Sequence, residues 1–317
     1  MPTPKESLGF QENFLGNGKL NIPLLPIIDQ SKYDLAELIG QPGNFVLDYD
    51  NYSVIMDKSR KFPILSASNI DGNLFKTLER KGSFKKDRRI DKSSQWGSDL
   101  YSADKSDFDK GHMTKREDVQ WGDESDSAKA AAISTFYYTN AVPQHHRLNR
   151  ATWRSIEDYI LKSETVKNSL KVVVFTGPVL HEKDPEFVTL VKNETIKLPV
   201  LFWKIVYYTS DDNKLFRTAF LVSQKELLER ENIVKKVRVT RSSETGVDKQ
   251  YFQKFKKAET YQVRVDLVEE LTGLNFSDAG ENFEESRPTK LILKNVNVRN
   301  SKTGEEEEKV IIKNLSL

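Results

Sequence analysis

Three strand-like segments near the middle of the chain constrain its fold more than any other feature. Residues 171–176, 198–208 and 215–222 are rich in β-branched and aromatic side chains, and the first segment ends at a Gly177-Pro178 break. We interpret the connections between these segments as too short for helical crossovers, so neighbouring strands are expected to run antiparallel. A chain with this centre builds its core on a sheet.

Further strands and helices are predicted before this centre. Residues 45–56 and 60–70 have a strand-like pattern and predict an antiparallel hairpin or two neighbouring strands. Residues 127–134 are alanine-rich, and residues 147–162 place apolar side chains at helical spacing, so both predict helices. The fold class is therefore α+β, with a central antiparallel sheet and helices packed on its faces.

The remaining segments carry weaker signals. A short helix is expected near residues 33–38, and the charged residues 226–250 predict a helix followed by a mobile loop. Residues 261–276 predict a strand and then a helix, with Asp266 as its N-terminal cap and Gly273 at its C-terminal end.

Composition excludes several kinds of chemistry. The chain has 317 residues and no cysteine, which rules out disulfides, thiolate nucleophiles and zinc–thiolate sites. Its net charge is only +2, so any site for a polyanion must come from local clustering. No signal peptide and no membrane span are recognisable. We therefore expect no membrane partner and a cytoplasmic protein, or a secreted one if a leader was removed.

One cluster of positive charge stands out at residues 76–92, where Lys and Arg greatly outnumber acidic residues. Such a stretch is usually a solvated surface loop. It is also what a rim that faces phosphate groups requires. The sequence leaves both interpretations open.

His112 is the first candidate for catalysis, because histidine titrates nearest to neutral pH and serves as a general base. A lone histidine is more often structural. His145 and His146 are expected to have structural or solvent roles, and His181 is expected to be incidental. Phe202 and Trp203, which are adjacent in the sequence, are expected in the core.

Asn149 and Glu157 strengthen the hypothesis that His112 is a catalytic base. They lie eight residues apart in the predicted helix of residues 147–162, a little over two turns, so their side chains share one stripe. An amide and a carboxylate opposite a histidine would form an oxygen-rich site with a nearby base. Hard cations such as Mg²⁺ prefer that kind of site.

The ordered motifs resemble those of the sugar-non-specific DNA/RNA endonucleases, which are ββα-metal nucleases with an Asp-Arg-Gly-His signature. The motifs are Asp109-Lys110-Gly111-His112-Met113, residues 139–144 (Thr-Asn-Ala-Val-Pro-Gln), Leu148-Asn149, Trp153 and Glu157. Similarity extends over roughly residues 45 to 276. The resemblance implies the ββα-metal fold and Mg²⁺-dependent hydrolysis of DNA and RNA, with Mn²⁺ as a substitute and 5′-phosphate products.

The resemblance also implies roles for individual residues. His112 would be the general base, Asn149 the direct Mg²⁺ ligand, and Glu157 would hold the waters of the metal. Asn140 would support the substrate or the base, and Asp109 belongs to the catalytic motif.

Two points of this assignment stay open. An arginine of this family faces the scissile phosphate, and Arg80 is the best match, with Arg88 and Arg89 as rivals. Lys110 replaces the arginine of the signature, so it keeps the charge for substrate binding but loses the planar two-pronged donor.

The chain is predicted to divide into an N-terminal strap (1–43), the endonuclease domain (44–276) and a C-terminal extension (277–317). Residues 290–298 and 309–315 predict a peripheral hairpin in that extension. The alternatives to a non-specific DNA/RNA endonuclease are a catalytically weakened nucleic-acid-binding protein on the same fold and a DNA-only nuclease under the control of a partner. DNA and RNA are the expected partners; an inhibitor or regulatory partner and a homodimer are left open.

Overall fold

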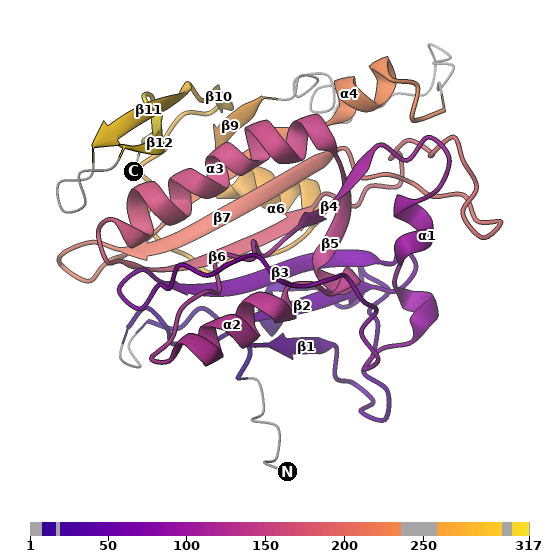
Figure 1. Cartoon of the computed structure of the whole chain (residues 1–317), viewed down its shortest axis with the longest axis horizontal. Helices are drawn as coiled ribbons and strands as arrows, with labels where there is room; N and C mark the ends of the chain where they lie inside the picture. Colours follow the sequence, from indigo (N-terminus) through magenta and orange to yellow (C-terminus); the bar gives the residue numbers. More distant parts are fainter. Residues whose placement is uncertain (1–7, 17–19, 236–258, 300–305, 317) are drawn as a thin grey trace.

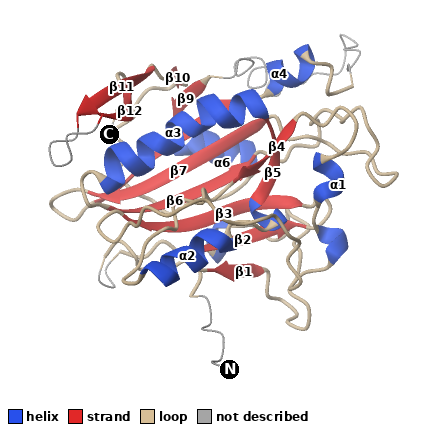
Figure 2. Ribbon diagram, in the orientation of Figure 1, coloured by secondary structure: helices blue, strands red, loops and turns tan. Residues whose placement is uncertain are grey.

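An eight-stranded antiparallel sheet forms the centre of the fold (Figures 1 and 2). The computed structural model describes residues 8–16, 20–235, 259–299 and 306–316. The strands lie in the order β1 (Val46–Tyr49), β2 (Tyr52–Asp57), β3 (Phe62–Asp71), β6 (Lys171–Pro178), β7 (Leu201–Thr209), β8 (Leu215–Ser223), β9 (Thr260–Val263) and β10 (Thr289–Lys290). Every neighbouring pair is antiparallel, as predicted for the three central strands.

Helices cover both faces of the sheet (Figure 1). The long helical run of residues 148–166 and the helix α2 (Ser125–Ser134) lie on one face, and α6 (Val265–Thr272) is seen behind the sheet. The short helices are α1 (Ser98–Tyr101), α4 (Lys225–Arg230) and the 3₁₀ turns Leu25–Ile27, Lys92–Ser94 and Tyr138–Asn140. In the described residues, no helix is long and apolar enough to cross a membrane.

The long helical run contains two π-helical stretches. It consists of a π-helix at Leu148–Trp153, α3 at Arg154–Asp158 and a second π-helix at Tyr159–Val166. A π-helix has i→i+5 hydrogen bonds and therefore more residues per turn than an α-helix. The eight-residue step from Asn149 to Glu157 consequently comes closer to two whole turns than an α-helix would allow.

The core lies between the sheet and this run. Trp153 packs its ring edge-on against Phe202, and Trp203 packs against Phe276 on the opposite side. Trp153, Phe202 and Trp203 are all fully buried, which confirms the expected core position of Phe202 and Trp203. Aromatic burial on this scale contributes strongly to stability.

A separate two-stranded ribbon carries the signature residues. Strand β4 (Phe108–His112) pairs antiparallel with β5 (Ala141–His145), so Gly111 lies opposite Val142 and Asp109 opposite Gln144. A Cβ atom at Gly111 would come within 2.2 Å of Gln144 Oε1. Because any side chain would collide there, the ribbon requires glycine immediately before His112.

In the tail, β11 (Leu293–Arg299) pairs antiparallel with β12 (Glu306–Ile312). The Ser163 hydroxyl of the long helical run donates a hydrogen bond to the Val310 carbonyl at 2.8 Å. The pair is thus joined to the same helical run that carries Asn149.

Several local predictions were wrong. Residues 33–38 form no helix, because the Ala36 N–H donates to the Met56 carbonyl and ties the segment to the sheet edge. Residues 45–56 form two strands instead of one, since Asn51 adopts a positive φ of 68° in a turn. The helix α6 has Arg264 at its N-cap; Asp266 lies in its first turn and accepts from the Arg264 side chain.

Other predictions hold in part. Gly273 ends α6 in the left-handed conformation, as expected. Of the helix and loop predicted at 226–250, only α4 is seen, and residues 236–250 lie outside the described residues.

We expect Gly111→Ala to lower the free energy of unfolding by about 1–3 kcal/mol, because the added methyl group overpacks the ribbon against Gln144. Thermal or urea unfolding of the purified variant measures this loss. The matched test is a double-mutant cycle with Gln144→Ala. The Gly111→Ala penalty should shrink when the Gln144 side chain is absent, and an undiminished penalty would place the clash elsewhere.

Candidate active site

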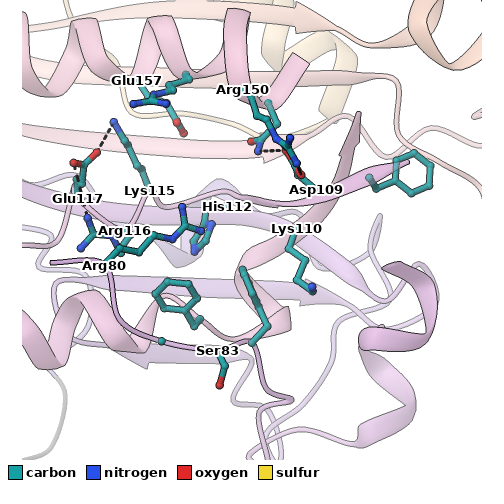
Figure 3. Close-up of a pocket in the computed structure, with 16 residues that line it drawn as sticks. Arg80, Ser83, Asp109, Lys110, His112, Lys115, Arg116, Glu117, Arg150 and Glu157 are labelled. Atoms are coloured by element: carbon teal, nitrogen blue, oxygen red, sulfur yellow. Dashed lines mark hydrogen bonds and ion pairs between the residues drawn. The ribbon is translucent and has the colours of Figure 1, made fainter. Parts of the chain in front are cut away.

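Six of the predicted residues meet in one open cavity of about 840 Å³ (Figure 3). Strand β4 supplies Asp109, Lys110 and His112, the long helical run supplies Asn149 and Glu157, and a loop supplies Arg80. The cavity also has six cationic side chains and only three acidic ones in its wall. The cationic residues are Arg80, Lys110, Lys115, Arg116, Arg150 and Arg154.

His112 lies in a cationic and aromatic environment. Its ring packs against Phe84 and Phe136, with centroids 5.0 and 5.3 Å away. Burial, together with the positive charges of Arg80 and Arg116, lowers the pKa of His112 to about 3. The imidazole is therefore neutral near pH 7. Its Nε2 atom is buried and has no hydrogen-bond partner in the described part of the chain, so it is available to accept a proton.

Asp109 orients Asn149 instead of facing the base. The Asn149 Nδ2 donates to Asp109 Oδ2 at 2.9 Å, and Arg150 donates to both carboxylate oxygens at 2.9 and 2.6 Å (Figure 3). Although partial burial opposes the charge, these donors lower the pKa of Asp109. The carboxylate thus fixes the Asn149 amide, whose carbonyl oxygen is the atom suited to a metal ion.

Glu157 is buried beside a buried lysine that the sequence prediction missed. Lys204 on β7 places its ammonium 3.5 Å from Glu157 Oε1 and 4.7 Å from the centre of the Trp153 ring. The same ammonium donates to the Met113 carbonyl and the Thr176 hydroxyl at 3.3 and 3.0 Å. Burial raises the pKa of Glu157, and Lys204 offsets part of that effect.

Further charges surround this pair. Lys115 bridges Asp158 at 2.5 Å and Glu117 at 2.9 Å, and burial raises the pKa of the neighbouring Asp118 to about 7. Figure 3 shows Lys115, Arg116 and Glu117 on the side of the cavity where Arg80 lies. None of these residues was predicted. Lys204 alone left a signal, as one charged residue inside the apolar run of a predicted strand.

The donors present fit a hard cation. Glu157 Oε1 is buried and, apart from its ion pair with Lys204, has no hydrogen-bond partner among the described residues. An amide oxygen from Asn149 and a carboxylate from Glu157 on one helical face are ligands or water acceptors of the kind Mg²⁺ takes.

Three predicted residues lie outside the cavity. Asn140 is fully buried: its side chain accepts from the Thr114 N–H at 2.9 Å and donates to the Thr114 and Thr135 carbonyls. It therefore cannot touch the substrate. Its backbone carbonyl accepts from the Met113 N–H at 2.9 Å, so Asn140 supports the segment that directly follows His112.

The rivals of Arg80 are also placed elsewhere. Arg89 is bound to Asp87 at 2.8 Å and packs over the Tyr49 ring, so it is structural. Arg88 is exposed and does not line the cavity. Of the basic stretch 76–92, only Arg80 brings a cationic side chain to the cavity, so the loop as a whole is not its rim.

Lys110 has a defined place. Its ammonium lies 5.4 Å from the centre of the Tyr101 ring and 5.7 Å from that of Phe84, within the range of cation–π contacts. The aromatic wall therefore holds a compact ammonium where the signature has a guanidinium.

The fold is that of the ββα-metal nucleases. A family model for the DNA/RNA non-specific endonucleases matches residues 36–283, and the chain belongs to that family. An uncharacterized protein of Sinorhizobium fredii, y4fB, is 30% identical over 228 residues, which are 69% of this chain and 33% of that protein. This chain thus spans about a third of that relative.

Two other comparisons, with a curated relative and with a solved structure, are consistent with this family. A nuclease of a Nostoc species is 24% identical over 254 residues, covering 79% of this chain and 80% of the relative. The structure of an EndoG/EndoGI complex, described as showing the mechanism of EndoG inhibition, contains a chain with 22% identity and a TM-score of 0.51. The match covers 75% of this chain and 87% of that one, and it supports the fold.

We expect the rate of nucleic-acid cleavage to stay high in mild acid. A base with a pKa of about 3 remains neutral as the pH falls well below 6.5, the ordinary value for histidine, and activity is lost only as the pH passes through the lowered pKa. Arg80→Gln removes a cation that lowers this pKa, so its normalised profile of kcat/KM against pH should fall off at higher pH. Arg88→Gln is the control, and a shift in that variant instead of Arg80→Gln would contradict the assignment.

Proposed function

We propose that the protein is a Mg²⁺-dependent endonuclease that hydrolyses phosphodiester bonds of DNA and RNA with little sequence preference and leaves 5′-phosphates. The observation that carries the proposal is the meeting of a neutral His112 with Asn149 and Glu157 in one cavity lined by cations. Contacts from cations to phosphate groups give affinity without sequence information. This suits an enzyme that cuts many sequences.

In the proposed mechanism, His112 Nε2 accepts the proton of the attacking water. Its low pKa makes it a weak base in the free enzyme, and the negative charge of a bound phosphate raises that pKa by opposing Arg80 and Arg116. Arg80 in turn stabilises the negative charge that develops on the phosphate oxygens. Lys110 and Arg154 extend the cationic wall for backbone phosphates on either side.

Asn149 and Glu157 would hold the Mg²⁺ ion, the first through its amide oxygen and the second through water. When bound, the ion supplies positive charge that stabilises the leaving oxygen. Asp109 fixes the orientation of the Asn149 amide, and Lys204 offsets part of the effect by which burial raises the pKa of Glu157.

We also propose a protein inhibitor as a partner. The support is the structural neighbour, which was captured as an EndoG/EndoGI complex. The open, cationic cavity is suited to an acidic segment of such a partner, because opposite charge steers association.

His112→Ala should abolish plasmid nicking in Mg²⁺, with a loss of at least about 10²-fold because the general base is gone. The unfolding temperature should stay near that of the wild type. EDTA should stop cleavage by the wild-type protein.

Parallel digests of duplex DNA, single-stranded DNA and RNA distinguish an enzyme that cuts both nucleic acids from one that cuts DNA alone. Binding without cleavage in Mg²⁺ by the wild type would instead establish the nucleic-acid-binding alternative.

Asn149→Ala should shift the Mg²⁺ dependence of the rate to higher concentrations by about 10-fold or more, as expected when a metal ligand is lost. The measurement is a Mg²⁺ titration at saturating DNA. Arg88→Ala is the control, since that side chain lies outside the cavity. An unchanged Mg²⁺ curve in Asn149→Ala would remove this residue from the metal site.

A further inference from the structure

We propose that Asp107, His145 and His146 form a site for a divalent transition-metal ion such as Zn²⁺, separate from the candidate active site. One ligand atom from each of these side chains lies within 4.8 Å of the other two. Imidazole nitrogens together with a carboxylate oxygen are ligands that Zn²⁺ takes. These residues are not among those that line the active-site cavity.

The ribbon register brings the three residues together. Asp107 directly precedes β4, and His145 ends β5 opposite Phe108 in the antiparallel pair. His146 follows at once, and the two imidazole rings stack with centroids 4.6 Å apart. The site is therefore built on paired strands instead of a loose loop.

The distances suit ligands that share one ion. Asp107 Oδ1 lies 3.0 Å from His146 Nδ1, and Asp107 Oδ2 lies 3.9 Å from His145 Nε2. Ligands about 2.0–2.1 Å from a tetrahedral Zn²⁺ lie about 3.3 Å from one another. These two separations, one to each oxygen of the Asp107 carboxylate, lie on either side of that value.

His146 Nδ1 gives an independent indication. The atom is buried, and within the described residues it has no hydrogen-bond partner. The Asp107 carboxylate is close enough, at 3.0 Å, but the contact lacks hydrogen-bond geometry. A buried nitrogen without a partner normally costs stability. A metal ion between the two groups would satisfy both.

Glu231, which follows α4, holds the His145 ring in the metal-free protein. Its Oε2 lies 2.8 Å from His145 Nε2. The Arg147 N–H donates to His145 Nδ1 at 3.2 Å, so in the metal-free protein Nε2 carries the ring proton and donates it to Glu231. Binding of the ion at Nε2 moves this proton to Nδ1, and the contact with the Arg147 N–H opens.

The ion would act as a clamp and not as a second catalytic centre. It would join two parts of the chain: the start of β4, which leads to His112, and the end of β5, which leads into the helix of Asn149. Metal ligands drawn from separate segments stabilise the folded state, because the unfolded chain has no such site.

The test is titration of EDTA-treated, desalted full-length protein with ZnCl₂ by calorimetry, in saturating Mg²⁺ so that the Asn149 site is filled. We expect one Zn²⁺ per chain in the wild type and an affinity at least about 10-fold lower in Asp107→Asn and His146→Ala. His181→Ala is the matched histidine control and should bind as the wild type does. Neither tested side chain is fully buried, and circular dichroism without zinc checks that the variants fold.

Asn149→Ala separates this inference from the proposed function. Zinc binding should persist in that variant even though its Mg²⁺ dependence changes. Absence of Zn²⁺ binding in the wild type would overturn the proposal, as would equal affinity in all variants. Loss of zinc in Asn149→Ala alone would assign the ion to the active site and would equally overturn it.

Discussion

The buried ammonium of Lys204 is the interaction on which the site depends. It contacts the Met113 carbonyl next to His112, the Thr176 hydroxyl on β6 and the Glu157 carboxylate on the helical run. A buried charge without a partner is strongly destabilising, so the ammonium and the carboxylate require each other. Strand, ribbon and helix are thereby fixed in one geometry around the cavity.

The charges around His112 are also arranged in a definite way. Burial lowers the pKa of His112, and Arg80 and Arg116 lower it further. The acidic side chains near the cavity form ion pairs with other cations: Asp109 with Arg150, and Glu117 with Lys115. The charged side chains that shift the pKa of the histidine are thus both cationic. Burial and these two cations together keep the imidazole neutral, and the same cations would attract phosphate, as the proposed reaction requires.

Much of the fold and part of the site could be predicted from the sequence. The central antiparallel strands follow from local patterns of β-branched and aromatic residues. His112, Asn149 and Glu157 were predicted to lie near one another, and they line the same cavity. The prediction was possible because these residues lie on a strand and a helical run, whose periodicity can be seen in the local sequence. The predicted helix at 33–38 failed because pairing with Met56 at the sheet edge overrode local propensity.

Local sequence patterns are enough to predict the class of fold and the family, and they make His112, Asn149 and Glu157 candidates for the site. Packing in three dimensions is needed to show that Arg80 reaches the cavity instead of Arg88 or Arg89, that Asn140 is buried, and that Asp109 accepts a hydrogen bond from the Asn149 amide. The ion pair between Lys204 and Glu157 and the π-helical stretch that begins at Leu148 are likewise seen only in the structure. The reason is physical: strand and helix periodicity is encoded by neighbours in sequence, whereas the pairing of charges is encoded by neighbours in space.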